Sequence, residues 1–90
     1  MTYEWDETKN RANIRKHGID FMDVPSMFQH PMATFLDQRM DYGEERWIGI
    51  GILKTIVAVV VFTEPKNGTI RIISARKAAT HEERIYRDEI

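Results

Sequence analysis

The chain has 90 residues, of which 42% are hydrophobic and 30% are charged, and its formal net charge is -1. This length predicts one domain, residues 1–90, with a small core. The near-neutral charge argues against a protein that binds nucleic acid through its overall field, since such proteins are usually basic. The absence of cysteine excludes disulfides and thiolate metal sites.

No segment suggests a membrane or a metal. The apolar run from Ile56 to Phe62 is too short to cross a bilayer, and the acidic, polar N-terminus does not resemble a signal sequence. We therefore expect a soluble, cytoplasmic protein that makes no membrane contact. The three histidines, His17, His30 and His81, lack the spacing of a zinc motif, so we expect neither a metal nor another cofactor.

A short strand and a polar helix are expected at the start of the chain. Thr2 to Glu4 suits a strand, and Asp6 suits the N-cap of a helix that runs to about His17. Gly18 then supplies the left-handed position that ends this helix. Three polar residues share one of its faces: Lys9, Asn13 and Lys16.

A second, shorter helix is expected after Asp20. Its buried stripe has helical spacing and consists of Phe21, Val24 and Phe28. Pro25 weakens this prediction, because a proline beyond the first turn removes a helix hydrogen bond. The pair His30-Pro31 ends the segment.

Four strands are expected next, namely Met32 to Leu36, Arg46 to Leu53, Thr55 to Thr63 and Thr69 to Ala75. A turn over Pro65-Lys66-Asn67-Gly68 is expected to join the last two as an antiparallel hairpin, and Asn-Gly is a strong signal for such a turn. The strand from Thr55 to Thr63 has apolar residues on both of its faces, which predicts a central position in the sheet with both faces covered.

The strand before it has two different faces. Ile48, Ile50 and Ile52 are expected to form a buried face. Gly49 and Gly51 on the opposite face leave room for a packed helix or for the backbone of a ligand.

Thr80 to Glu83 has the pattern of a capping box, so a final helix is expected from about His81. The complete order is strand, helix, helix, four strands, helix. This order predicts an α+β fold, a compact and mostly antiparallel sheet with two N-terminal helices and one C-terminal helix.

Two arginines, Arg71 and Arg76, bracket a mostly apolar run at the end of the last predicted strand. A guanidinium at the edge of a core either pairs with a carboxylate or binds an anion, and phosphate matches its geometry. The two residues are five positions apart, which in a regular strand sends them to opposite faces. They share a face only if the strand ends or bulges near Ser74 and Ala75.

Several short motifs together resemble a known family. They are Trp5-Asp6, Lys9, Asn13, Lys16-His17-Gly18, Phe21, Gly43-Glu44-Glu45-Arg46, the run from Arg71 to Ala78, and Glu83-Arg84-Ile85-Tyr86. Their order and spacing resemble the BrnT family of bacterial toxins over nearly the whole chain. The resemblance implies a compact domain similar to the RelE toxins. It also implies a metal-independent ribonuclease that stops translation and is neutralised by BrnA, a ribbon-helix-helix antitoxin, with DNA contacted only through that antitoxin.

A ribonuclease that uses no metal needs a base for the 2′-hydroxyl, cations for the phosphorane and an acid for the leaving 5′-oxygen. The product would be a 2′,3′-cyclic phosphate. Our candidate catalytic residues are Arg76, Arg46, His17 and Lys16. Our candidate RNA-binding residues are Arg71, Lys9, His81 and Tyr86. Glu82 and Glu83 are further candidates for proton transfer.

Each candidate also has a structural interpretation. His17 suits a helix C-terminus, Lys16 a solvated helix end and His81 a solvated first turn. Arg46 could pair with one of three nearby carboxylates, Asp41, Glu44 or Glu45. Two other functions therefore stay open, a non-catalytic module that binds a DNA-binding partner and a nucleic-acid-binding domain without turnover.

Overall fold

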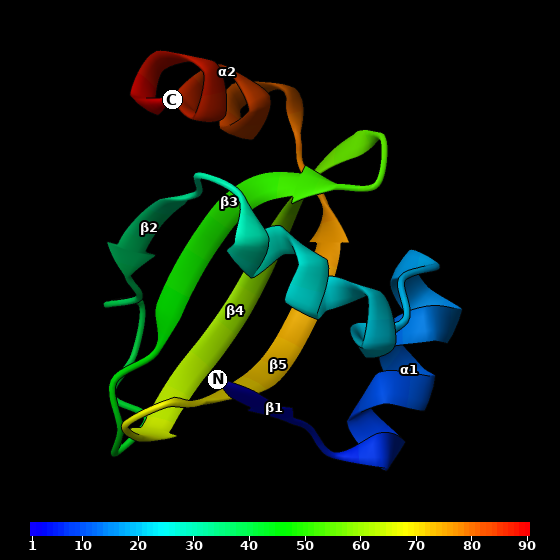
Figure 1. The fold of residues 1–90 in the computed structure, drawn as a ribbon, viewed down its shortest axis with the longest axis vertical. Helices are drawn as coiled ribbons and strands as arrows, with labels where there is room; N and C mark the ends of the chain where they lie inside the picture. Colours follow the sequence, from blue (N-terminus) through cyan, green and yellow to red (C-terminus); the bar gives the residue numbers. More distant parts are fainter.

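The computed structural model describes residues 1–90 as a five-stranded sheet with helical segments on both faces (Figure 1). The strands are β1 (Thr2–Glu4), β2 (Ala33–Leu36), β3 (Trp47–Leu53), β4 (Ile56–Lys66) and β5 (Thr69–Lys77). The helices are α1 (Glu7–His17), the 3₁₀ helix η1 (Phe21–Gln29) and α2 (Thr80–Glu89). This confirms the predicted α+β fold and the predicted order of elements. None of the helices has the length and apolar content needed to span a membrane.

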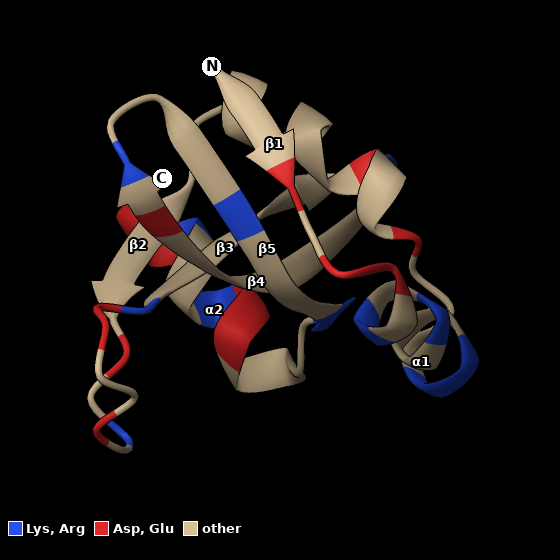
Figure 2. Ribbon diagram, turned by 90° about the horizontal axis from the view of Figure 1, so that it is seen from below, with Lys and Arg blue, Asp and Glu red and all other residues tan.

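The strands lie in the order β1-β5-β4-β3-β2. Only β1 pairs in parallel, with β5, and the other pairs are antiparallel. The sheet is therefore mostly antiparallel, as expected. Figure 2 shows that α2 and the charged loop between β2 and β3 project from the same side of it.

Local capping sets the ends of α1. The Asp6 side chain accepts a hydrogen bond of 3.1 Å from the Lys9 amide, and Gly18 has the left-handed φ of 71° expected of it. The buried side chain of Asn13 then joins α1 to β5. Its Nδ2 donates to the carbonyls of Ile19 and Ala75, at 3.0 and 2.8 Å, and its Oδ1 accepts from the Ala75 amide at 3.1 Å.

The second helix differs from expectation in type. It is a 3₁₀ helix in which Phe21, Val24 and Met27 are buried. A 3₁₀ helix has three residues per turn, so its buried stripe repeats every third residue and includes Met27 in the place predicted for Phe28. Phe28 is half-buried and packs against Phe62, with ring centroids 5.0 Å apart.

The glycine face of β3 packs against the main core. A Cβ at Gly49 would lie 2.5 Å from Met32 Sδ, so these glycines make room for the segment that enters β2 and leave none for a ligand. The isoleucine face is covered less completely than predicted. Ile50 is buried there, whereas Ile48 and Ile52 are only half-buried.

Two separate hydrophobic clusters cover the central strand β4. Ala58, Val60 and Phe62 belong to the main core beneath η1, whereas Val59 belongs to a small cluster against which Ile85 and Tyr86 of α2 pack. Both faces of β4 are therefore in contact with other elements, as predicted. Val61 stays half-buried, because α2 covers only part of its face.

A β-bulge in β5 determines where its arginines point. Ser74 pairs with Val61 and Ile72 pairs with Phe62, so Ile73 is an extra residue in the ladder. Arg71 pairs with Thr63 of β4, and Arg76 pairs with Val59. Thr63 and Val59 are four residues apart in β4, so their side chains lie on the same face of the sheet. The bulge therefore places both arginines on the face that carries α2.

The start of α2 corrects one predicted cap. The N-cap is Ala79 in place of Thr80, and the Ala79 amide donates to Glu82 Oε1 at 2.8 Å. Glu82 fills the role predicted for Glu83, because an ion pair with Arg76 holds its carboxylate beside this amide.

Candidate active site

A hollow of about 280 Å³ lies on the sheet face that carries α2. Its floor comes from β3, β4 and β5, and charged residues stand at its sides. The lining residues are Arg39, Ile48, Val59, Val61, Ser74, Arg76 and Glu82. The hollow exists because α2 packs over the Val59 end of this face and leaves Val61 and Ile48 only half-buried.

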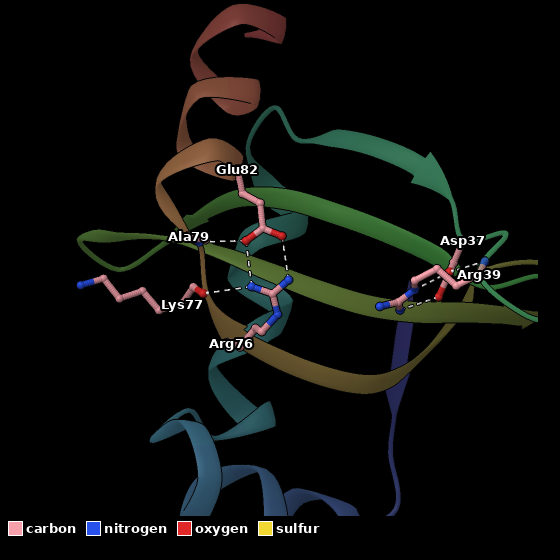
Figure 3. Close-up of polar contacts among 6 residues, drawn as sticks. All are labelled: Asp37, Arg39, Arg76, Lys77, Ala79 and Glu82. Carbon is pink, nitrogen blue, oxygen red and sulfur yellow. Dashed lines mark hydrogen bonds and ion pairs between the residues drawn. The ribbon is translucent and has the colours of Figure 1, made fainter.

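Arg76 stands at the α2 side of this hollow, paired with Glu82 (Figure 3). Its Nη1 and Nη2 donate to Glu82 Oε1 and Oε2 at 2.8 and 2.7 Å. These bonds lower the pKa of Glu82 to about 2 and raise the pKa of Arg76. A carboxylate with so low a pKa is a weak base, so Glu82 is suited to positioning Arg76 and unsuited to proton transfer.

Arg39 stands at the side formed by the β2–β3 loop. Its Nε and Nη2 donate to Oδ1 and Oδ2 of Asp37, each at 2.8 Å, and Tyr42 donates to Asp37 Oδ2 at 3.3 Å. The hydrogen bonds from Arg39 lower the pKa of Asp37 well below its usual range. Sequence reasoning missed this pair, because the only signal was one arginine within an acidic segment.

A second hollow, of about 230 Å³, lies where α1 meets β5. It is lined by the face of α1 that carries Lys9 and Lys16, together with His17 and Ser74. Both lysines are exposed and neither forms an ion pair within the protein. Ser74 lines both hollows, so the cations of α1 and the Arg76 side of the sheet border one continuous stretch of surface.

Arg71 lies farther along the same face of β5. It pairs with Glu4 of β1, from Nη2 to Oε2 at 2.6 Å. Arg71 and Lys9 line a third hollow, and Lys9 lines the second hollow as well. Five predicted residues, Lys9, Lys16, His17, Arg71 and Arg76, therefore follow β5 in a row of adjoining hollows.

The other three predicted residues lie outside these hollows. The Arg46 guanidinium lies 4.0 Å from the centre of the Tyr42 ring, and its Nη2 is 3.8 Å from Glu44, which is the structural interpretation considered for it. His81 is exposed in the first turn of α2. Tyr86 packs against the small cluster that holds α2 to the sheet. The structure does not bring Arg46, His81 and Tyr86 to the hollow that contains Arg76.

Comparison with known proteins decides the family. The family model described as "Ribonuclease toxin, BrnT, of type II toxin-antitoxin system" matches residues 5–82. The chain belongs to the BrnT family. The crystal structure of the Brucella abortus ribonuclease toxin BrnT is similar, with 30% sequence identity and a TM-score of 0.72, over 89% of this chain and 100% of that chain. A search of curated protein sequences gave no match.

Membership of the BrnT family makes the chain a ribonuclease toxin of a type II toxin-antitoxin system. It implies an RNA target and an antitoxin partner. The structure contains no group of three or more histidine, aspartate or glutamate side chains that could hold a metal ion.

Proposed function

We propose that this BrnT-family toxin is a metal-independent endoribonuclease that stops translation by cleaving RNA at the junction of α1 and β5. The 2′-hydroxyl attacks the adjacent phosphorus, the bond to the 5′-oxygen breaks, and the products carry a 2′,3′-cyclic phosphate and a 5′-hydroxyl. The shared position of Ser74 supports this site most strongly, because it joins the surface of Lys16 and His17 to that of Arg76.

Each residue in this proposal has a distinct part. His17 exchanges protons with the reacting oxygens, since histidine is the side chain that most often serves as a general acid and base. Arg76 and Lys16 stabilise the charge that develops on the phosphorane oxygens. Lys9 and Arg71 bind the RNA strand farther along β5, where they share a hollow. Arg46 acts indirectly, by stacking on Tyr42 in the β2–β3 loop.

The reaction itself can be tested with one pair of substrates. The purified protein, treated with EDTA, is incubated with an RNA and with the same RNA carrying a single 2′-deoxyribose at each cleaved position. We expect cleavage of the first, a cyclic phosphate at the new end, and no cleavage at the deoxy positions. Intact RNA, or cleavage only after Mg²⁺ is added, would refute the mechanism.

The residues can be tested with matched charge changes in α1. We expect Lys16→Gln to lower kcat/KM about 100-fold, as the loss of one charge-stabilising donor does elsewhere. His17→Gln should lower it about 100-fold or more. Arg15→Gln is the control, because it removes one positive charge from the same turn of α1 but Arg15 lines none of the three hollows. If Lys16→Gln and His17→Gln are as active as Arg15→Gln, α1 contributes no residue to the active site.

We also propose that the antitoxin is a BrnA-like ribbon-helix-helix protein and that the toxin contacts DNA only through it. The resemblance of the chain to the BrnT family supports the first part. The net charge of -1 supports the second, since it provides no general attraction to the phosphate backbone. The toxin alone should leave promoter DNA of its own operon unshifted in a gel, whereas the complex should shift it. A shift by the toxin alone would contradict the proposal.

A further inference from the structure

Arg39 is an exposed arginine that is bonded to a buried carboxylate. Its side chain is 66% exposed, whereas the Asp37 side chain that holds it is 0% exposed. The Asp37 carboxylate also accepts from the Arg39 amide at 3.1 Å and from Tyr42. A buried carboxylate with two bonds to one guanidinium removes most of the rotamer freedom that an exposed arginine normally has.

The fixed guanidinium retains donors for a ligand. Arginine has five N–H groups, and the bonds to Asp37 use one on Nε and one on Nη2. Both hydrogens of Nη1 and the second hydrogen of Nη2 have no partner within the protein. Figure 3 shows the Arg39 side chain extending from the loop across the sheet, toward the side on which Arg76 lies.

The charges around the hollow are arranged for an anion. Arg39 and Arg76 both line it, with side chains 66% and 41% exposed. Of their carboxylate partners, Asp37 is 0% exposed and does not line the hollow, whereas Glu82 is 12% exposed and lines it beside Arg76. The positive charge of Arg39 lowers the pKa of Arg76, against the larger rise caused by Glu82. This effect shows that the two cations repel each other across the hollow. A phosphate between them would relieve this repulsion.

We propose that Arg39 is a second phosphate-binding residue of the RNA site, facing Arg76 across the hollow, and that Asp37 is its positioning residue. This inference rests on the ribonuclease site proposed above. It extends that site from α1 and β5 to the β2–β3 loop, on the far side of β4 and β3. Bound RNA would therefore cross the sheet face as well as follow β5.

The test measures binding separately from cleavage. The probe is a fluorescent RNA with a single 2′-deoxyribose at the cleavage position, and its Kd is measured by anisotropy at several salt concentrations. We expect Arg39→Gln to weaken binding about tenfold. The slope of log Kd against log salt should fall by about 0.7, the value for one lost contact to a single-stranded phosphate. Arg15→Gln, the control used above, should change neither.

Folding must be controlled, because Arg39→Gln leaves the buried Asp37 carboxylate without its partner. The double variant with Asp37→Asn and Arg39→Gln removes both charges, and Arg39→Lys keeps the charge but loses the two parallel bonds. We expect the double variant to bind as weakly as Arg39→Gln, and Arg39→Lys to bind more weakly than wild type with an unchanged salt slope. All variants are compared after circular dichroism shows that they are folded.

The two proposals fail in different ways. If wild type cleaves RNA and both folded variants that lack Arg39 bind with the wild-type Kd and salt slope, the role of Arg39 is overturned and the ribonuclease site stands. If wild type binds the probe through Arg39 but cannot cleave RNA in EDTA, the proposed reaction is overturned and the phosphate contact stands. If wild type does not bind the probe at all, both proposals are overturned.

Discussion

The side chain of Asn13 is the strongest single connection between α1 and the sheet, and its loss should be costly. In Asn13→Ala the fold loses three hydrogen bonds, two of them to the backbone of Ala75 in β5 and one to the carbonyl of Ile19. The side chain is buried, so the backbone groups left behind cannot all be reached by water. The change therefore removes favourable contacts and leaves unsatisfied polar groups.

The size of the effect follows from these bonds. A net contribution of about 1 kcal/mol per hydrogen bond gives a loss of about 3 kcal/mol in the free energy of unfolding. In a domain of this size each kcal/mol shifts Tm by roughly 4–8 °C, so we expect a drop of at least about 12 °C. Asn13→Asp should lose at least as much. It keeps the acceptor for the Ala75 amide but turns a carboxylate oxygen toward the carbonyls of Ala75 and Ile19.

Urea unfolding followed by far-UV circular dichroism measures this loss. Arg15→Ala is the control, because Arg15 is exposed in the same helix and makes no side-chain hydrogen bond. The reasoning is refuted if Asn13→Ala loses less than about 1 kcal/mol, or no more than the control. The same variant should also lower RNA cleavage where it is still folded, since Lys16 and His17 reach Ser74 only while α1 is held against β5.

Two further predictions concern the pH dependence of stability and the packing of β3. The pKa of Glu82 falls from 4.5 to about 2 on folding, so its stabilisation is complete above about pH 4.5 and is lost as the pH falls toward 2. Glu82→Gln should therefore cost about 1 kcal/mol at pH 7, because solvent screens the exposed side of the pair, and the difference from wild type should vanish near pH 2. Unfolding midpoints between pH 2 and 7 measure this, and a constant difference would contradict it. Gly49→Ala should cost about 1–3 kcal/mol because its Cβ would crowd Met32, Val60 and Phe62. Gly51→Ala meets its nearest atom at 3.2 Å and should cost less, and thermal unfolding that ranks the two variants in the opposite order would show the packing argument to be wrong.

Features fixed by local chemistry could be predicted from the sequence. Asp6 and Gly18 end α1 through contacts with neighbouring residues, and Asn67-Gly68 forms the turn between β4 and β5. The 3₁₀ form of η1 was not predicted, because the helix type depends on how Phe21, Val24 and Met27 pack beneath the sheet. Helix propensity and hydrophobic periodicity in the sequence give no information about that packing.

The candidate site was predicted only in part, for the same reason. Lys9 and Lys16 share a helical face, and that spacing alone brings them together. The contact between Arg39 and the hollow depends instead on the path of the β2–β3 loop over the sheet, which no local pattern specifies. For Arg46 the local pattern was misleading about position. It belongs to a motif that resembles the family, which suggested a place in the site, whereas its guanidinium lies over the Tyr42 ring.

The bulge at Ile73 also bears on how the chain can change in length. Removing this one residue would leave Ser74 and Ile72 opposite Val61 and Phe62 in an uninterrupted ladder. Both arginines of β5 would keep their face after such a deletion, because four positions would then separate them in a regular strand. Shortening the strand at the bulge should therefore be tolerated, and related chains that lack one residue here would retain the same arrangement of charges.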